Sequence, residues 1–191
     1  TITDQEFALF QRLIHRLAGI SLSDAKRVLL VGRLGRRLEH HGLLTYGEYY
    51  RLLSSGRDPD EVQKMVDLLT TNETYFFREP QHFDFLRDLV RQEASAGNPF
   101  RIWSGASSSG EEAYSMAMVL AEYCLQRPWE VFGSDISLTV LAKARAGVYS
   151  QERISCIPPA YLRKYCLKGV GAQEGKLLID AGLRQKVSFA Q

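Results

Sequence analysis

The sequence predicts a protein in two parts, a small bundle of helices followed by an α/β domain. Over residues 1–70, apolar residues recur at the spacing of amphipathic helices, and no segment alternates as a strand does. Beyond residue 70, short apolar runs alternate with longer helical segments, as in domains built on a parallel sheet. We therefore predict a helical domain over 1–70 and an α/β domain over 71–191.

Four helices account for the first part of the chain, and each has a polar capping residue or a glycine at an end. Side-chain oxygens of Ser, Thr and Asp satisfy the free N–H groups where a helix starts, and glycine adopts the left-handed turn where it stops. The predicted boundaries are Gly19 at the end of the first helix, Ser23–Asp24 and Gly42 around the second, Thr45–Glu48 at the start of the third, and Asp60 at the start of the fourth.

The second part has the element order of a nucleotide-binding α/β unit: strand, small-residue loop, helix, strand and acidic residue. A long helix precedes this unit, and Gly97–Pro99 breaks that helix. The tail over 165–191 has short strand-like runs near glycines. The predicted segments are a helix over 80–96, a strand over 100–103, a loop over 104–110, a helix over 111–125, a strand over 129–132 and a helix over 137–146.

Bulk composition points to an ordinary cytoplasmic protein. The formal net charge is +2, which argues neither for nor against nucleic acid as a partner. The three cysteines and four histidines lack the spacing of a disulfide framework or a metal site. No apolar run reaches the ~20 residues needed to cross a bilayer, and no signal peptide opens the chain. Because the chain starts at Thr1 and stops after a strand-like run, we expect a fragment.

The loop after the first strand allows a ligand to approach the backbone closely. It reads WSGASSSGEE over 103–112, with glycine only at Gly105 and Gly110. Small side chains leave the backbone open, and the following helix can direct free N–H groups at a ligand. A plain strand-to-helix turn is the alternative, because GxGxxG is absent. GxSxG is absent too, so the three serines do not indicate a hydrolytic nucleophile.

Asp135 follows the second strand, where nucleotide-binding folds place a carboxylate that accepts hydrogen bonds from ribose hydroxyls. The alternative is an N-cap for the next helix. Loop and carboxylate together are more specific than either alone. They leave open whether the ligand is NAD, another nucleotide or S-adenosylmethionine.

A further segment, TTNETYFFRE over 70–79, decides between these ligands through a resemblance. By composition alone it is a linker with aromatic anchors. With the segments that follow, however, it resembles the CheR family of methyltransferases, which esterify glutamate side chains of bacterial chemoreceptors. The similar segments occur in the family's order and are TTNETYFFRE (70–79), RIWSGASSSGEEAYS (101–115), GSDIS (133–137), KARAGVYS (143–150) and IPPAYLRKYC (157–166).

The resemblance implies a fold, a cofactor and a reaction. The implied fold is a helical bundle joined to a Rossmann-like S-adenosylmethionine-dependent methyltransferase domain, incomplete in this chain, with a small antiparallel β insertion over 165–189. S-adenosylmethionine is the implied methyl donor and S-adenosylhomocysteine the product. Family members continue with further strands and further groups of the site. The 191 residues alone are therefore expected to be weak or inactive as a catalyst.

The resemblance also implies roles for particular residues. Arg78 matches a catalytic position, where its planar guanidinium can orient the acceptor carboxylate; a structural pair with Glu73 or Glu79 is the alternative. A glutamate carboxylate is already ionised at neutral pH, so its attack on a methylsulfonium needs alignment in a partly dehydrated site and no general base. The residues that match donor-binding positions are Asn72, Thr74, Arg78, Gly105, Ala106, Glu112 and Asp135.

Two regions of the chain are candidate partner-binding surfaces. Lys26, Arg33, Arg37 and His40 form a basic stripe on the second helix that suits acidic receptor helices, although a solvated helix face is the usual explanation. Some family members add a short peptide from the receptor's C-terminal end as a strand to the β insertion over 165–189. Neither nucleic acid binding nor membrane insertion is expected.

Three rival functions stay open: an NAD-binding dehydrogenase, a non-catalytic receptor-docking adaptor derived from such a methyltransferase, and a methyltransferase with a different acceptor. The incomplete glycine pattern argues against the dehydrogenase. Retention of Asn72, Arg78, Glu112 and Asp135 argues against the adaptor.

Overall fold

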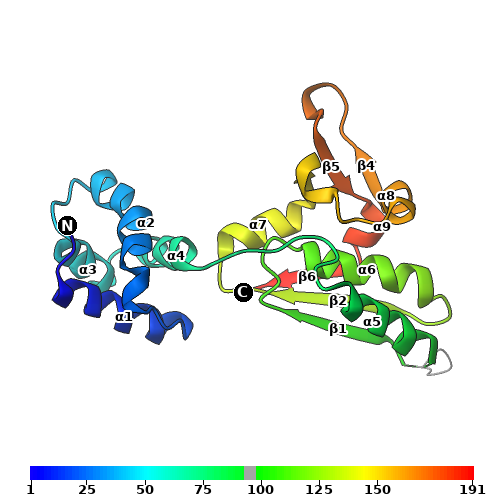
Figure 1. The fold of residues 1–191 in the computed structure, drawn as a ribbon, viewed down its shortest axis with the longest axis horizontal. Coiled ribbons are helices and arrows are strands. Elements are labelled where there is room, and N and C mark those ends of the chain that lie inside the picture. Colours follow the sequence, from blue (N-terminus) through cyan, green and yellow to red (C-terminus); the bar gives the residue numbers. More distant parts are fainter. Residues whose placement is uncertain (93–97) are drawn as a thin grey trace. The chain divides into compact units, whose positions relative to one another are not determined.

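The computed structural model describes residues 1–92 and 98–191, and the chain divides into two compact units, Thr1–Thr71 and Asn72–Gln191 (Figure 1). The predicted end of the long helix at 93–96 and the predicted break at Gly97 lie outside the described residues. Within the described ranges, no helix combines the length and the apolar character that crossing a bilayer requires.

The first unit is helical, as the spacing of its apolar residues predicts. Gly19 ends the first helix with a left-handed φ of 66°, and Thr45 and Glu48 form the predicted capping box of the third. The helices are α1 (Asp4–Ala18), α2 (Arg27–His40), α3 (Tyr46–Ser54) and α4 (Pro59–Leu69), with a 3-10 turn, η1 (Asp24–Lys26), before α2. The buried core of this unit includes Phe10, Leu30, Leu34, Tyr49 and Met65.

The start of α4 differs from the prediction. Asp58, not Asp60, is the N-cap, and its Oδ1 accepts a hydrogen bond from the Glu61 N–H at 3.0 Å. Pro59 takes the first helical position, where its fixed φ suits the helix and its missing N–H costs no hydrogen bond. The cap is therefore the residue before the proline, and Asp60 lies exposed in the first turn.

A buried carboxylate links three of these helices. Glu61 on α4 is fully buried, and it accepts hydrogen bonds from Arg37 Nε on α2 at 2.8 Å and from the Tyr49 hydroxyl on α3 at 2.7 Å. His41 Nε2 lies 3.2 Å from the same carboxylate. Burial by itself raises the pKa of Glu61, but the bonds from Arg37, Tyr49 and His41 outweigh burial and lower the pKa to about 2. Glu61 is therefore ionised in the folded bundle.

The second unit contains a parallel and an antiparallel sheet. Its first elements are α5 (Pro80–Gln92), β1 (Phe100–Gly105), α6 (Glu111–Tyr123), β2 (Trp129–Ser134) and α7 (Leu138–Ala146). Its later elements are β3 (Val148–Ser150), η2 (Gln151–Ile154), α8 (Pro159–Tyr165), β4 (Cys166–Lys168), η3 (Gly171–Gln173), β5 (Lys176–Ile179), α9 (Ala181–Arg184) and β6 (Val187–Ala190).

The parallel sheet has the order β1-β2-β6, with Ile102 opposite Val131 and Val131 opposite Val187. Helix α6 packs against this sheet and is buried along most of its length. The other face of the sheet exposes 69% of Trp103 and 41% of Phe132. The strand-loop-helix-strand order therefore forms the predicted α/β unit around one covered sheet face.

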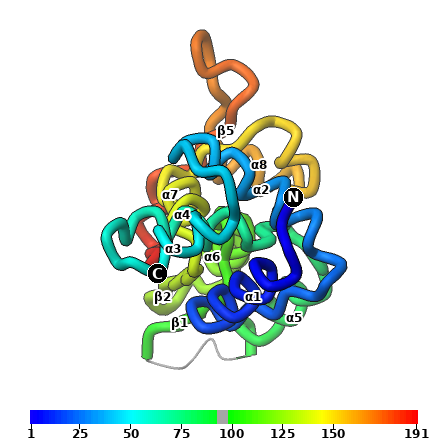
Figure 2. The backbone as a smooth tube through the Cα atoms, turned by 90° about the vertical axis from the view of Figure 1, so that its left-hand side faces the viewer, coloured from blue at the N-terminus to red at the C-terminus, as the bar shows by residue number. Residues whose placement is uncertain are grey.

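The antiparallel sheet differs in membership from the insertion predicted over 165–189. Its order is β3-β5-β4, so it takes in β3, which precedes the predicted segment. β6, whose first three residues lie within that segment, joins the parallel sheet instead. An apolar run predicts that a strand forms but not which strand it pairs with, because its partner is distant in the sequence. The β4–β5 hairpin projects from the rest of its unit (Figures 1 and 2).

Candidate functional site

The predicted loop and acidic residue meet at one edge of the parallel sheet. β1 ends at Gly105 and β2 ends at Ser134, and these two residues lie opposite each other. Loop residues 106–110 and Asp135 follow these strand ends directly. Open α/β sheets bind ligands at the carboxyl ends of their strands, so this edge is the candidate site.

The two carboxylate oxygens of Asp135 accept hydrogen bonds from different segments, one from the loop and one from the start of α7. Its Oδ2 accepts the Ser108 N–H at 2.8 Å, and its Oδ1 accepts the Ser137 N–H at 2.9 Å. Ser137, whose side chain accepts the Val140 N–H, is the N-cap of α7, so the N-cap alternative for Asp135 is wrong. These bonds fix the half-buried carboxylate in one orientation, and each oxygen keeps a lone pair for another donor.

Backbone strain is concentrated in two sequence segments of this unit. Left-handed backbone costs a residue other than glycine about 1–2 kcal/mol, and such residues cluster where function requires a fixed geometry. Two of the four cases lie in the segment 72–79, and two lie in the loop after β1. Among the described residues, the non-glycine residues with positive φ are Phe77 (54°), Glu79 (56°), Ala106 (56°) and Ser108 (49°).

Serines close the loop onto its surroundings. The Ser107 N–H donates to the Ser134 carbonyl at 2.8 Å, which holds the loop on the end of β2. Ser108 Oγ donates to the Asn72 carbonyl at 3.2 Å, which brings the 72–79 segment to the loop. Ser107 Oγ is buried and has no hydrogen-bond partner among the residues the structure describes; a ligand or a water satisfies such an atom. Gly105 and Ala106 are exposed, so their backbone is open to a ligand.

Gly110 turns the loop into α6 at a crowded point. It is the N-cap of α6, it has a φ of 93°, and it is buried. A Cβ at this position would lie 2.9 Å from Ala144 Cβ and 3.1 Å from the Tyr149 hydroxyl oxygen. Both the backbone conformation and the available space therefore require glycine.

The two adjacent glutamates at the start of α6 have different surroundings. Glu112, a predicted donor-binding residue, is exposed, and its Oε1 accepts a hydrogen bond from Ser104 Oγ at 2.7 Å. Glu111 is fully buried, and its carboxylate accepts Ser109 Oγ at 2.6 Å and Arg153 Nη1 at 2.5 Å. Glu112 is thus open to a ligand, while Glu111 supports the loop from inside.

The segment 72–79 is an ordered part of the second unit. The Phe77 N–H donates to Ser115 Oγ on α6 at 3.0 Å, and Ser115 Oγ donates to the Glu111 carbonyl at 2.7 Å. The rings of Phe76 and Phe77 are buried in the core of this unit. The segment is therefore anchored to α6, and the interpretation as a mere linker fails.

Arg78 projects from this segment into solvent. Its Nη1 donates to the Glu73 carbonyl at 3.2 Å, and its guanidinium carbon lies 5.9 Å from the centre of the Tyr75 ring. The contact is with the main chain of Glu73 and not with its carboxylate. Asn72 and Thr74 of the same segment are half-buried, whereas Arg78 is exposed. The Arg78 guanidinium is therefore accessible to a carboxylate from outside the segment.

Sequence reasoning missed three residues that support the loop: Glu111, Tyr149 and Arg153. The Tyr149 hydroxyl on β3 donates to the Ser109 carbonyl at 2.7 Å. Burial raises the pKa of Tyr149 well above its ordinary value, so this hydroxyl stays protonated and can donate. Glu111 adjoins Glu112, which was a usable signal, but nothing near Tyr149 or Arg153 in the sequence indicates their partners.

The residues of the basic stripe predicted on the second helix fall into two groups, those bonded within the bundle and those exposed. Arg33 Nη1 donates to two main-chain carbonyls at the end of α4, both at 2.9 Å, and Arg37 binds the buried Glu61. Both side chains therefore serve the bundle itself. Lys26 and His40 are the exposed members of the stripe.

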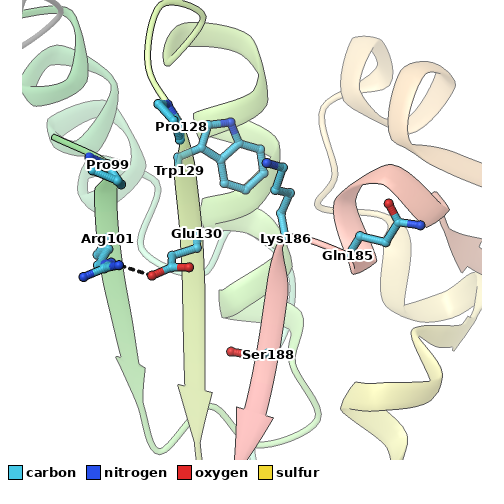
Figure 3. Close-up of a pocket in the computed structure, with 8 residues that line it drawn as sticks. All are labelled: Pro99, Arg101, Pro128, Trp129, Glu130, Gln185, Lys186 and Ser188. Atoms are coloured by element: carbon cyan, nitrogen blue, oxygen red, sulfur yellow. Dashed lines mark ion pairs between the residues drawn. The ribbon is translucent and has the colours of Figure 1, made fainter. Parts of the chain in front are cut away.

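A cavity of about 320 Å³ lies at the other end of the strands, near Pro99 and Pro128 (Figure 3). Arg101 and Glu130 point toward each other there as an ion pair of 2.5 Å. This cavity adjoins the amino ends of β1, β2 and β6, so it is separate from the loop and Asp135. Within the described part of the chain, no group of three or more His, Cys, Asp or Glu side chains could hold a metal ion.

Comparison with known proteins agrees with this geometry. Residues 72–191 match the family described as "CheR methyltransferase, SAM binding domain", and residues 5–70 match "CheR methyltransferase, all-alpha domain". The chain is 41% identical to the chemotaxis protein methyltransferase of Escherichia coli over 191 residues, which cover 99% of this chain and 66% of that protein.

Two other relatives give the same picture. Identity is 41% to chemotaxis protein methyltransferase 2 of Pseudomonas aeruginosa, over 99% of this chain and 68% of that protein. The chain is 38% identical to the chemotaxis protein methyltransferase of Salmonella typhimurium, over 99% of this chain and 65% of that protein. The chain thus spans about two thirds of the length of these relatives.

The predicted fold class and the predicted S-adenosylmethionine-binding domain are confirmed by these matches. The all-alpha match covers the helical unit, and the SAM-binding match covers the unit that holds the loop, Asp135 and the 72–79 segment. With both units matched in order and relatives at 41% identity, the chain belongs to the CheR methyltransferase family.

Proposed function

We propose that the protein transfers a methyl group from S-adenosylmethionine to glutamate carboxylates of bacterial chemoreceptors, giving glutamate methyl esters and S-adenosylhomocysteine. The observation that carries the proposal is the carboxylate of Asp135, fixed by the strained loop and the start of α7 at the carboxyl edge of the sheet. The names of the matched family and of the relatives support methyl transfer from S-adenosylmethionine and a role in chemotaxis.

The residues at this edge fit the methyl donor by their chemistry. Asp135 offers acceptor oxygens to ribose hydroxyls, and Gly105 and Ala106 offer exposed backbone. Glu112 exposes a carboxylate that can accept from a ligand amine, and Asn72 adds a polar group beside the loop. When bound, S-adenosylmethionine supplies a methyl group on a positively charged sulfur, activated for transfer to a nucleophile.

Arg78 is the residue that we propose orients the acceptor. Its guanidinium is exposed, and it contacts the Glu73 carbonyl and the Tyr75 ring of its own segment. These contacts restrict the positions that the guanidinium can take. The acceptor carboxylate is ionised at neutral pH, since glutamate has a reference pKa near ~4.3, so the chain needs no general base. A bidentate grip on both oxygens would weaken the nucleophile, so alignment is the proposed role.

Calorimetry with S-adenosylhomocysteine, on a form of the protein extended to the relatives' length, tests the proposed donor site. We expect Asp135→Ala to abolish binding, because it removes the ribose acceptor and releases the Ser108 N–H. Asp180→Ala is the matched control, since Asp180 also accepts a backbone N–H, that of Gly182 at 2.8 Å, but at the start of α9. Equal binding by both variants and the unaltered protein would reject the assignment of Asp135.

We further propose that the 191 residues alone bind the donor weakly and catalyse poorly, because the relatives are about half as long again. The comparison is between this chain and a form extended to the relatives' length. Methyl transfer at equal rates by the two forms would contradict the proposal.

The partner of the helical unit is proposed to be the acidic cytoplasmic helices of a chemoreceptor, which also places the protein in the cytoplasm. Lys26 and His40 support this, because both are exposed on one helical unit, whereas Arg33 and Arg37 are engaged within it. Lys26→Glu should slow receptor methylation and leave donor binding unchanged; an equal effect from Arg51→Glu, on α3, would show that bulk charge alone matters.

A second contact is proposed at the antiparallel sheet, for a short peptide from the receptor's C-terminal end. β4 is an edge strand, and 54% of Leu167 on it is exposed. Arg163, Lys168 and Lys176 line a cavity of about 300 Å³ beside it, which suits an acidic peptide added as a strand. Titration of the protein with an acidic receptor-tail peptide, followed by NMR, should shift the amides of β4; unshifted amides would remove this contact.

A further inference from the structure

We propose that Arg153 is a positioning residue for the loop over 104–110, which it holds through the buried carboxylate of Glu111. The inference rests on the proposed function, because it takes this loop as part of the methyl-donor site. Arg153 lies on η2, directly after β3 of the antiparallel sheet. A residue of the antiparallel region would thus determine the geometry of a ligand site on the parallel sheet.

The contacts converge on Ser109. Its Oγ donates to Glu111 Oε2 at 2.6 Å, and its carbonyl accepts the Tyr149 hydroxyl at 2.7 Å. Arg153 Nη1 lies 2.5 Å from Glu111 Oε1 and 3.4 Å from Ser109 Oγ. One guanidinium nitrogen therefore contacts both the serine and the carboxylate to which that serine donates.

Charge explains why Arg153 controls the orientation of Glu111. The Glu111 side chain is 0% exposed, whereas the Arg153 side chain is 49% exposed. A buried carboxylate is unfavourable unless a cation and hydrogen bonds replace the lost water. Removal of the guanidinium leaves the carboxylate to turn toward other donors or water, and Ser109 Oγ then loses its fixed acceptor.

Ser109 transmits this constraint to the donor side of the loop. Ser108 precedes it with a φ of 49°, and the Ser108 N–H donates to Asp135 Oδ2 at 2.8 Å. A non-glycine residue stays in the left-handed region only where its surroundings determine its conformation. Because Ser109 is fixed through both its side chain and its carbonyl, the Ser108 N–H stays directed at Asp135.

The same group of contacts supports the segment 72–79. The Tyr149 ring packs edge-on against Phe76, with 4.9 Å between ring centres. The Glu111 carbonyl accepts Ser115 Oγ, which in turn accepts the Phe77 N–H. The first turn of α6, which carries the Glu111 carboxylate, therefore also supports the segment 72–79 through its main chain.

The test compares Arg153→Gln, which removes the charge, with Arg153→Lys, which keeps a charge with fewer donors. Both are made in a form of the protein extended to the relatives' length. Lys164→Gln is the matched control. Lys164 lies on α8, away from the loop, and forms an exposed ion pair of 2.7 Å with Glu122. The two readouts are hydrogen exchange of the Ser108 amide in the free protein and the affinity for S-adenosylhomocysteine.

We expect faster exchange at Ser108 and affinity reduced about tenfold or more in Arg153→Gln, the loss typical of a charge-assisted hydrogen bond. Arg153→Lys should recover part of both, and Lys164→Gln should change neither. A lower melting temperature with unchanged Ser108 exchange and unchanged affinity would show a purely structural role and overturn the inference. If Arg153→Gln fails to fold, Arg153→Lys decides by the same two readouts.

The two proposals fail in different ways. If the unaltered protein does not bind S-adenosylhomocysteine, the proposed function is rejected. The exchange rate of Ser108 then still decides whether Arg153 holds the loop. If the unaltered protein binds and Arg153→Gln binds equally well, the proposed function stands and the role of Arg153 is rejected.

Discussion

At the scale of single residues, the candidate site depends on groups whose hydrogen bonds are made within the protein. Asp135 is fixed by two N–H groups, and Ser109 is fixed through its hydroxyl and its carbonyl. Such bonds set the geometry of a site in advance, so that less ordering is required when a ligand binds. The residues that matter are therefore both those that face a ligand and those that hold them.

Gly110→Ala should destabilise the second unit and weaken donor binding. The new Cβ would lie 2.9 Å from Ala144 Cβ, and the left-handed backbone adds about 1–2 kcal/mol. Gly171→Ala is the control, because its φ is 57° but nothing lies within 4 Å of the position that its new methyl group would take. Both tryptophans lie in the second unit, so urea unfolding followed by tryptophan fluorescence reports on it. Equal destabilisation by the two substitutions would refute the crowding argument.

Glu61 should make the stability of the helical unit depend on pH. Its pKa falls from 4.5 to about 2 on folding, so its stabilisation is complete above the unfolded pKa and is lost as the pH falls toward 2. The shift corresponds to stabilisation on the order of 3 kcal/mol. Denaturant unfolding followed by far-UV circular dichroism at several pH values measures it.

Glu61→Gln should remove that part of the acid dependence and lower the stability at neutral pH, because Arg37 and Tyr49 lose a charged partner. Glu39→Gln, at an exposed position on α2, is the control. An acid profile that stays the same after Glu61→Gln would show that other groups cause it.

At the scale of elements, local signals predicted most boundaries and failed where a partner was distant. Gly19 and the Thr45–Glu48 capping box act within one turn of helix, so the sequence shows them directly. The order of β1, loop, α6 and β2 follows from apolar runs and small residues. The pairing of β3 with β5, and of β6 with β2, depends on residues far apart in the chain, so the predicted insertion contained β4 and β5 but omitted β3 and included most of β6.

The same contrast holds for the site. Asp135 and the loop were predictable because strand ends and small residues have local signatures. Tyr149 and Arg153 were not, because their roles come from contacts with Ser109 and Glu111, some forty residues away. An isolated tyrosine or arginine after a short strand carries no signal of such a contact.

Asp58→Ala should destabilise the helical unit by about 1 kcal/mol, the usual effect of removing an N-cap acceptor. Asp60→Ala should have a smaller effect, because Asp60 lies exposed in the first turn and only its charge near the helix start is lost. The two free energies of unfolding, measured by circular dichroism, distinguish the observed cap from the one that the sequence suggested. A larger loss for Asp60→Ala would restore the sequence prediction.

At the scale of the whole molecule, the chain combines two units with separate cores, and the donor-site residues all lie in the second. The helical unit exposes Lys26 and His40, which we propose face the receptor. The antiparallel sheet has β4 at its edge, which we propose binds a receptor peptide. Donor site, receptor-facing helix and peptide-binding edge are thus proposed on different elements. Changes to one should alter one step of the reaction and leave the others measurable.

The most direct test of the central proposal is mass spectrometry of a chemoreceptor cytoplasmic fragment after incubation with S-adenosylmethionine and a form of the protein extended to the relatives' length. We expect methyl esters on glutamate side chains, absent with Asp135→Ala and present with Asp180→Ala. If the protein binds both S-adenosylhomocysteine and the receptor fragment but no glutamate ester forms, the proposed methyl transfer is rejected, and the protein is better described as a receptor-docking adaptor.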